Sequence, residues 1–194
     1  ADYIFINTGS KSVIPSIQGI QEAKHIYTSA TIMKETTLPK NLAIIGGGYI
    51  GLELASMYAR YGSQVTVFEL NERLVGREDE DVALEIQHIL ENQGVQFKFK
   101  SRVQEVSNQN EKAVIHYSQD ETRYIDRFDA ILLATGRSAN TADLGLENTG
   151  VQMNERGQII VNEYLQTDVP HIYAMGDVKG GLQFTYISLD DYRI

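Results

Sequence analysis

Residues 41–70 read NLAIIGGGYIGLELASMYARYGSQVTVFEL, and this stretch decides the fold. An apolar run, Leu42–Ile45, leads into a glycine cluster, then a helix-like segment, and then a second apolar run that ends at Glu69. The order is strand, tight turn, helix and strand. It predicts a Rossmann-like α/β domain, in which a parallel sheet carries helices.

The glycines have the spacing G-x-G-x-x-G, with Gly46, Gly48 and Gly51 at the three fixed positions. The first glycine lets the chain leave the strand sharply, the second lets the backbone approach a pyrophosphate, and the third lets the helix lie close to the sheet. The phosphates would lie at the free N–H groups of the helix N-terminus. The alternative is a plain tight turn before a packed helix.

Glu69 stands at a strand end, 18 residues after Gly51. A carboxylate there can accept both ribose hydroxyls of an adenosine, whereas it would repel a 2′-phosphate. The sequence therefore favours NADH over NADPH, although Arg73 lies close enough in sequence to weaken that preference. The alternative for Glu69 alone is a solvated acid at the end of a strand.

Composition excludes several classes of function. The 194 residues carry a formal net charge of −9, so a nucleic-acid partner is not expected, because phosphate binding needs a basic face. No apolar run approaches the length of a membrane-spanning helix, so no membrane is expected. The absence of cysteine excludes disulfides and thiol catalysis within these residues and fits a cytoplasmic setting. The four histidines have no ligand spacing, so no metal site is expected.

The rest of the chain alternates in type. Helical periodicity, acids in the first turn and a following glycine predict a helix over 77–92. Three short runs separated by polar turns predict an antiparallel meander, over 103–106, 113–117 and 123–128. The patterns also predict strands at 95–99, 130–134, 158–161 and 171–174, a strand-like run at 1–9, a connector over 10–40 and a short helix at 28–33.

Four motifs resemble one family in order and spacing. They are INTGS ending at Ser10, IGGGYIGLE ending at Glu53, ATGR ending at Arg137 and AMGD ending at Asp177. The chain resembles the FAD-dependent pyridine nucleotide-disulfide oxidoreductases, the group of dihydrolipoamide dehydrogenase, glutathione reductase and mercuric reductase, along essentially its whole length. Its last fifteen residues are most similar to the bacterial branch linked to resistance against reactive chlorine species and hypothiocyanous acid.

The resemblance implies that the chain is the central piece of a longer enzyme. Residues 1–24 would end the first segment of an FAD-binding domain and form a connector, 25–136 would be the NAD(P)-binding domain, and 137–194 would return to the FAD domain. The family's redox-active cysteine pair and its C-terminal His-Glu pair have no counterpart, so no catalytic residue is expected here. The parent enzyme would be a homodimer through a C-terminal domain that these residues do not include.

The resemblance also suggests residue roles. Tyr49 resembles the aromatic gate over the flavin; the alternative is a residue that packs at the start of the helix. Glu53 resembles the acid near the nicotinamide carboxamide; the alternative is an acid on the solvated face of the helix. Asp177 resembles the carboxylate that binds the ribitol of FAD. The expected NAD-binding residues are Gly46, Gly48, Tyr49, Ile50, Gly51, Glu53, Glu69 and Gly136, and the expected FAD-binding residues are Thr8, Gly9, Gly176 and Asp177.

The function expected from these observations is the nucleotide-binding part of a flavoprotein that passes hydride from NADH to FAD and on to a redox-active disulfide. Nicotinamide and flavin nucleotides would be its partners, and the isolated chain would be inactive. Two alternatives stay open: a free-standing NAD-binding module without turnover, and a flavin reductase relative that lacks the disulfide.

Overall fold

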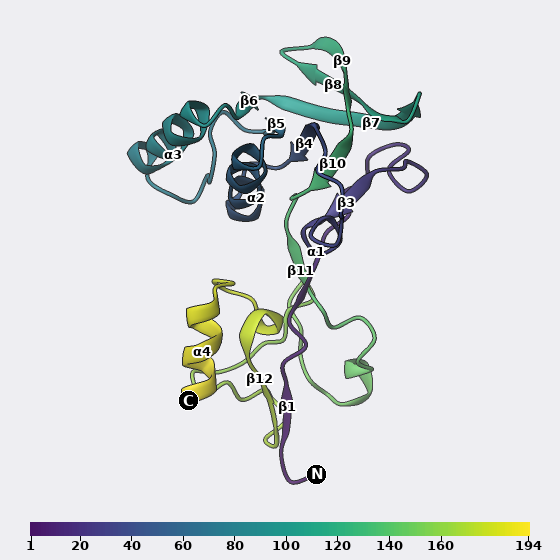
Figure 1. Ribbon diagram of the computed structural model, residues 1–194. Coiled ribbons are helices and arrows are strands. Elements are labelled where there is room, and N and C mark those ends of the chain that lie inside the picture. Colours follow the sequence, from purple (N-terminus) through teal and green to yellow (C-terminus); the bar gives the residue numbers. More distant parts are fainter. The chain divides into compact units, whose positions relative to one another are not determined.

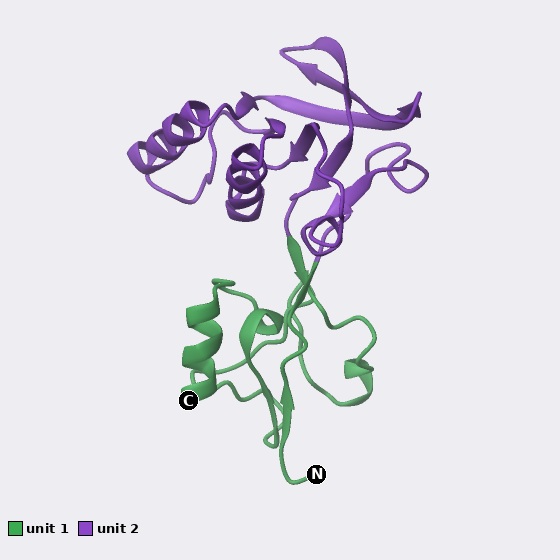
Figure 2. Ribbon diagram, viewed as in Figure 1, with its two compact units in different colours: residues 1–11, 137–194 green, residues 12–136 purple.

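The computed structural model describes residues 1–194, which form two compact units. Unit 1 combines residues 1–11 with 137–194, and unit 2 comprises residues 12–136 (green and purple in Figure 2). Each unit has its own hydrophobic core. None of the helices combines the length and the apolar composition that crossing a bilayer requires.

Unit 2 is built on a five-stranded parallel sheet (Figure 1). Its strands, in spatial order, are β3 (Ile26–Thr28), β10 (Ala130–Leu133), β4 (Asn41–Ile45), β5 (Gln64–Phe68) and β6 (Gln96–Lys98). All residues of β10 are buried, as expected for a strand that is covered on both faces. Strand β4 lies between β10 and β5, so the glycine turn that follows it starts from the middle of the sheet.

The sheet is covered by helices on one face and by a meander on the other. Helices α2 (Tyr49–Arg60) and α3 (Glu80–Asn92) share a core with Leu42 and Ile44. The next residues along the strand, Ala43 and Ile45, point to the other face because side chains alternate along a strand. There they pack against the antiparallel strands β7 (Ser101–Gln109), β8 (Lys112–Gln119) and β9 (Thr122–Phe128).

Unit 1 holds little helix and two small sheets, and strand β2 of the second sheet ends at Ser12, the first residue of unit 2. Strand β1 (Ile4–Ile6) pairs in parallel with β12 (Ile172–Ala174), and β2 (Ser10–Ser12) pairs with β11 (Arg137–Ala139). The helical elements are the 3₁₀ turns η1 (Leu146–Asn148) and η2 (Gly176–Lys179) and the helix α4 (Thr185–Arg193). Strand β1 is only partly covered, since the side chain of Phe5 is 61% exposed.

The predicted fold class is confirmed. The strand, turn, helix and strand of residues 41–70 form as predicted, and the antiparallel meander follows them with longer strands than the apolar runs indicated. The short helix predicted at 28–33 corresponds to α1 (Ser29–Ile32).

Four details differ from the predictions. The predicted connector over 10–40 contains two strands that form by pairing with distant segments, β3 with β10 and β2 with β11. Residues 158–161 form no strand and make one isolated bridge, Met153 to Ile159. Helix α4 forms where the sequence patterns predicted no helix. Its residues show no apolar period, and its single buried residue is Asp191. Helix α3 begins at Glu80 because the residues before it are used in the loop described below.

Candidate functional site: a glycine turn, its loop and the adjoining cleft

The glycine turn connects β4 to α2 at the carboxyl edge of the parallel sheet. Gly46 has φ +112°, a backbone conformation that favours glycine, and its N–H donates to the carbonyl of Phe68 at 2.9 Å. A Cβ added at Gly51 would overlap the carbonyl oxygen of Gly46 and lie 3.3 Å from Cβ of Ala134. The close contact that the sequence predicted for Gly51 is therefore present in the structure.

Gly48 precedes the first residue of α2 and faces open space, since a Cβ there would meet nothing within 4 Å. The first N–H groups of a helix have no acceptor within the helix, and they carry the positive end of its dipole. A pyrophosphate can therefore approach this backbone without a side chain in the way.

Glu69 is buried, with 8% of its surface exposed, and its carboxylate accepts three hydrogen bonds. Oε2 accepts from the N–H of Gly47 at 2.8 Å. Oε1 accepts from the backbone N–H of Asn71 at 2.8 Å and from Nδ2 of Asn71 at 2.7 Å. A carboxylate offers about four acceptor positions. In this arrangement one acceptor position, on Oε2, is left over, so Glu69 supports the turn and also lines the adjoining cleft.

The loop of residues 70–79, which we call the strap, runs from β5 to α3 along the glycine turn. The N–H of Val75 donates to the carbonyl oxygen of Gly47 at 3.0 Å, so both backbone polar groups of Gly47 are taken by Glu69 and the strap. Leu74 and Val75 are buried, and a Cβ at Gly47 would lie 2.8 Å from Leu74 Cδ2. A larger residue at position 47 would therefore require the side chain of Leu74 to shift.

Tyr49 begins α2, and its hydroxyl donates to Glu78 Oε1 of the strap. This hydrogen bond is the largest cause that raises the pKa of Tyr49; desolvation and the charge of Glu78 add to it, while Arg77 opposes it. Ile50 is half-buried, and Glu53 is exposed on α2. None of these three residues lines the adjoining cleft.

A cleft of about 540 Å³ opens beside the glycine turn. Its lining includes Gly46, Gly47, Gly48, Glu69 and Gly136, which lie far apart in the sequence. The cleft therefore joins the acid that would bind adenosine to the glycine that would lie near the reactive end of the nucleotide. It lies at the carboxyl ends of the strands, where open α/β sheets bind their ligands.

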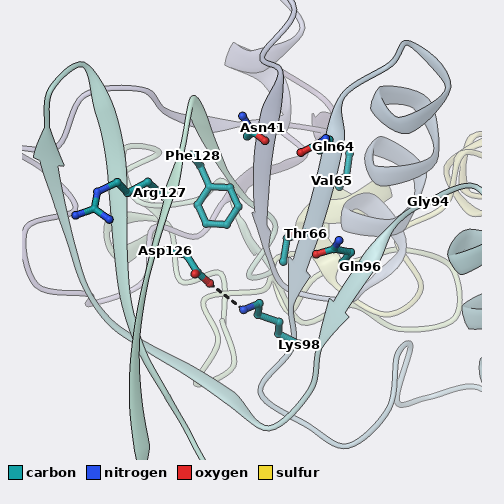
Figure 3. Close-up of a pocket in the computed structure, with 10 residues that line it drawn as sticks. All are labelled: Asn41, Gln64, Val65, Thr66, Gly94, Gln96, Lys98, Asp126, Arg127 and Phe128. Carbon is teal, nitrogen blue, oxygen red and sulfur yellow. Dashed lines mark hydrogen bonds and ion pairs between the residues drawn. The ribbon is translucent and has the colours of Figure 1, made fainter.

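A second cleft, of about 440 Å³, is lined by residues at the amino ends of β4 and β5 together with residues of β6 and β9 (Figure 3). Lys98 Nζ donates to Asp126 Oδ2 at 2.8 Å and to the hydroxyl of Tyr117, and lies 5.8 Å from the ring centroid of Phe68. Burial alone lowers the pKa of Lys98, but the hydrogen bonds to Asp126 and Tyr117 outweigh it, so this pKa is raised. The charged pair is satisfied internally and joins the meander to the sheet.

The residues expected to bind flavin lie together in unit 1. Asp177 Oδ2 accepts from Ser10 Oγ at 2.6 Å, and Ser10 Oγ in turn accepts from Arg137 Nε at 2.7 Å. The hydroxyl of Thr8 donates to the carbonyl of Asn140 at 2.8 Å.

Two glycines adjoin this chain of hydrogen bonds. Gly9 has φ +68° and faces open space, while Gly176, with φ +69°, donates its N–H to Asp191 Oδ2 at 2.7 Å. Carboxylate and hydroxyl groups of this kind can hydrogen-bond a polyol, whose hydroxyls both donate and accept hydrogen bonds.

Sequence reasoning missed four residues of these sites. Asn71 gave no signal, and Glu78 was interpreted as an acid in the first turn of the predicted helix, because the partners of both residues are set by the path of the strap. Ser10 and Asp191 are tied to Asp177 and Gly176 from 167 and 15 residues away. No three His, Cys, Asp or Glu side chains lie close enough together to bind a metal ion.

These features define a Rossmann-like α/β domain with a cleft at the carboxyl edge of its sheet, and comparison with known proteins establishes the family. Residues 1–191 match the model of the pyridine nucleotide-disulphide oxidoreductases, and the chain belongs to that family. Members of this family depend on FAD and NAD(P).

Among curated relatives, the chain is 46% identical over 191 residues to the probable pyridine nucleotide-disulfide oxidoreductase RclA of Escherichia coli, covering 98% of this chain and 42% of that protein. It is 37% identical to the mercuric reductase of Streptomyces lividans, covering 97% and 39% of the two chains. The solved structure of the HOCl-induced flavoprotein disulfide reductase RclA from E. coli superposes with a TM-score of 0.91 at 45% identity, covering 99% and 43%. The chain thus spans less than half the length of these relatives.

Proposed function

We propose that these residues are the nucleotide-binding central part of a flavoprotein oxidoreductase that passes hydride from NADH to FAD and on to a redox-active disulfide. The observation that carries the proposal is the cleft that joins Gly48, Glu69 and Gly136 at the carboxyl edge of the sheet. FAD, when bound, supplies the electron transfer between nicotinamide and disulfide. The residues present supply binding and orientation.

The roles proposed within unit 2 are supported by the geometry for Gly48, Glu69 and Gly136 and by the family resemblance for Tyr49 and Glu53. Gly48 and the α2 N-terminus would hold the pyrophosphate, and Glu69 would accept a ribose hydroxyl at its remaining acceptor position. A 2′-phosphate would bring negative charge to a buried carboxylate, which is unfavourable. Gly136, with φ +118°, would let the backbone approach the nicotinamide half. Tyr49 would act as the gate and Glu53 would lie near the carboxamide.

The roles within unit 1 are proposed in the same way. Asp177 and Gly176 would contact the ribitol of FAD, and Thr8 and Gly9 would lie toward its adenine half. Tyr3, which precedes β1, is 64% exposed, and Phe5 within β1 is 61% exposed. Such exposed aromatic residues support a role for unit 1 as one part of a larger domain. A homodimeric parent and a cytoplasmic location belong to the same proposal.

Calorimetric titration of the chain with NADH and NADPH tests the proposal. We expect NADH to bind more tightly than NADPH, and equal or tighter binding of NADPH would contradict the role given to Glu69. We also expect the chain to purify without flavin absorbance and to oxidise no NADH with a disulfide or quinone acceptor, since it has no cysteine. A yellow, active sample would show that these residues form a complete flavoprotein.

A further inference from the structure

The hydrogen bond between Tyr49 and Glu78 joins the first residue of α2 to the strap. Glu78 lies one residue before Asp79, the N-cap of α3. Tyr49 is 41% exposed, and its side chain does not line the cleft although its neighbour Gly48 does. The phenol is therefore held beside the cleft by a contact that the glycine motif does not require.

The position of Glu78 is fixed from the glycine turn itself. Its N–H donates to the carbonyl of Val75 at 2.8 Å, and the N–H of Val75 donates to the carbonyl of Gly47 at 3.0 Å. Val75 has φ +37°, a strained conformation for a β-branched residue, and it persists because the surrounding contacts fix it. The glycine turn thus positions both residues. Tyr49 directly follows it in the chain, and Glu78 is linked to it by hydrogen bonds through Val75.

We propose that Glu78 is a positioning residue that holds the ring of Tyr49 beside the cleft and so keeps the glycine turn open to the nucleotide. This inference rests on the proposed NADH site. A tyrosine side chain at the start of a helix has more than one staggered rotamer. Without the carboxylate of Glu78 the ring would gain orientations that cover the turn, and the apparent NADH affinity would fall with the fraction of molecules in which the turn is open.

The test compares Glu78→Ala with Glu78→Gln in NADH titrations of the chain. Both changes remove a negative charge near the helix N-terminus, so any relief of repulsion toward the phosphates is common to them. Only glutamine keeps an acceptor for the hydroxyl of Tyr49. We expect E78A to bind NADH about twofold to tenfold more weakly than E78Q, the range of one hydrogen bond.

The same comparison in a Tyr49→Ala background is the control. With the ring absent, Ala and Gln at position 78 are expected to give equal NADH affinities. Equal affinities in the presence of Tyr49 would overturn the inference. So would a difference between the two variants that persists after the ring is removed, because that effect would not act through Tyr49.

A second measurement needs no nucleotide. In samples labelled with ¹³C at the tyrosine ζ carbon, the signal missing from Tyr49→Phe identifies Tyr49, and its titration is followed by NMR. We expect its pKa to be lower in E78A than in the unchanged chain, and identical titrations would overturn the inference. If the unchanged chain failed to bind NADH, the proposed function would fail, while this titration would still decide whether Glu78 holds Tyr49.

Discussion

Replacing Glu69 by glutamine is the sharpest perturbation of the glycine turn, because both carboxylate oxygens accept hydrogen bonds from backbone N–H groups. Oε2 accepts from Gly47 and Oε1 from Asn71, at 2.8 Å each. Either orientation of a glutamine amide would place its NH₂ group against one of these donors. Leaving a buried donor without a partner costs about 1–3 kcal/mol. We therefore expect Glu69→Gln to destabilise unit 2 by that amount.

Thermal unfolding and amide hydrogen exchange measure this effect. Each kcal/mol corresponds to about 2–4 °C in Tm at this chain length, and the N–H of Gly47 or of Asn71 is expected to exchange faster in the variant. NADH affinity should fall as well, because the turn that receives the phosphates is less well fixed. In addition, Glu69→Ala should narrow the difference in binding free energy between NADH and NADPH by about 1–2 kcal/mol.

Glu72→Gln is the matched control, since it removes the same charge three residues further along the chain, within the strap. Glu72 is exposed and pairs with Lys100 at 2.7 Å on the surface, where ion pairs contribute little. We expect its stability and its Gly47 exchange rate to equal those of the unchanged chain. If Glu69→Gln behaved like this control, the reasoning that Glu69 supports the turn would be refuted.

Three further outcomes are expected. Gly51→Val should cost about 1–3 kcal/mol by overpacking and abolish NADH binding; unchanged calorimetric affinity would contradict the turn assignment. Asp129→Asn should make the free energy of unfolding fall less steeply as the pH is lowered. Burial raises the pKa of Asp129, but hydrogen bonds from Lys112 and the N–H of Asn41 outweigh it and lower that pKa. The stabilisation that ionised Asp129 contributes is therefore complete above about pH 4 and is lost as the pH falls through the lowered pKa of Asp129 in the folded state. Urea unfolding at pH 2–6 checks this. Lys98→Met should destabilise unit 2 by leaving Asp126 without its partner, and an unchanged urea midpoint would exclude that role.

The local sequence was sufficient to predict the strand, turn, helix and strand of residues 41–70. Strand β4, the turn, α2 and β5 form where the pattern predicted them, because each signal acts within a few residues: apolar strand positions, glycine spacing and helical period. The alternation of Leu42 and Ala43 between two cores follows directly from the geometry of a strand. The residue roles, the domain limits at 24 and 136 and the preference for NADH remain predictions.

Tertiary structure decided what depends on partners distant in sequence. Strand β3 is too short for any periodic signal and exists through its pairing with β10. Helix α4 has no apolar face from which it could be predicted. Its one buried residue, Asp191, accepts a hydrogen bond from the N–H of Gly176. The sequence placed Glu69 at a strand end but left it as a solvated acid or a ribose ligand. Only the folded path of the strap shows that its carboxylate also holds Gly47, because that hydrogen bond joins residues 22 positions apart.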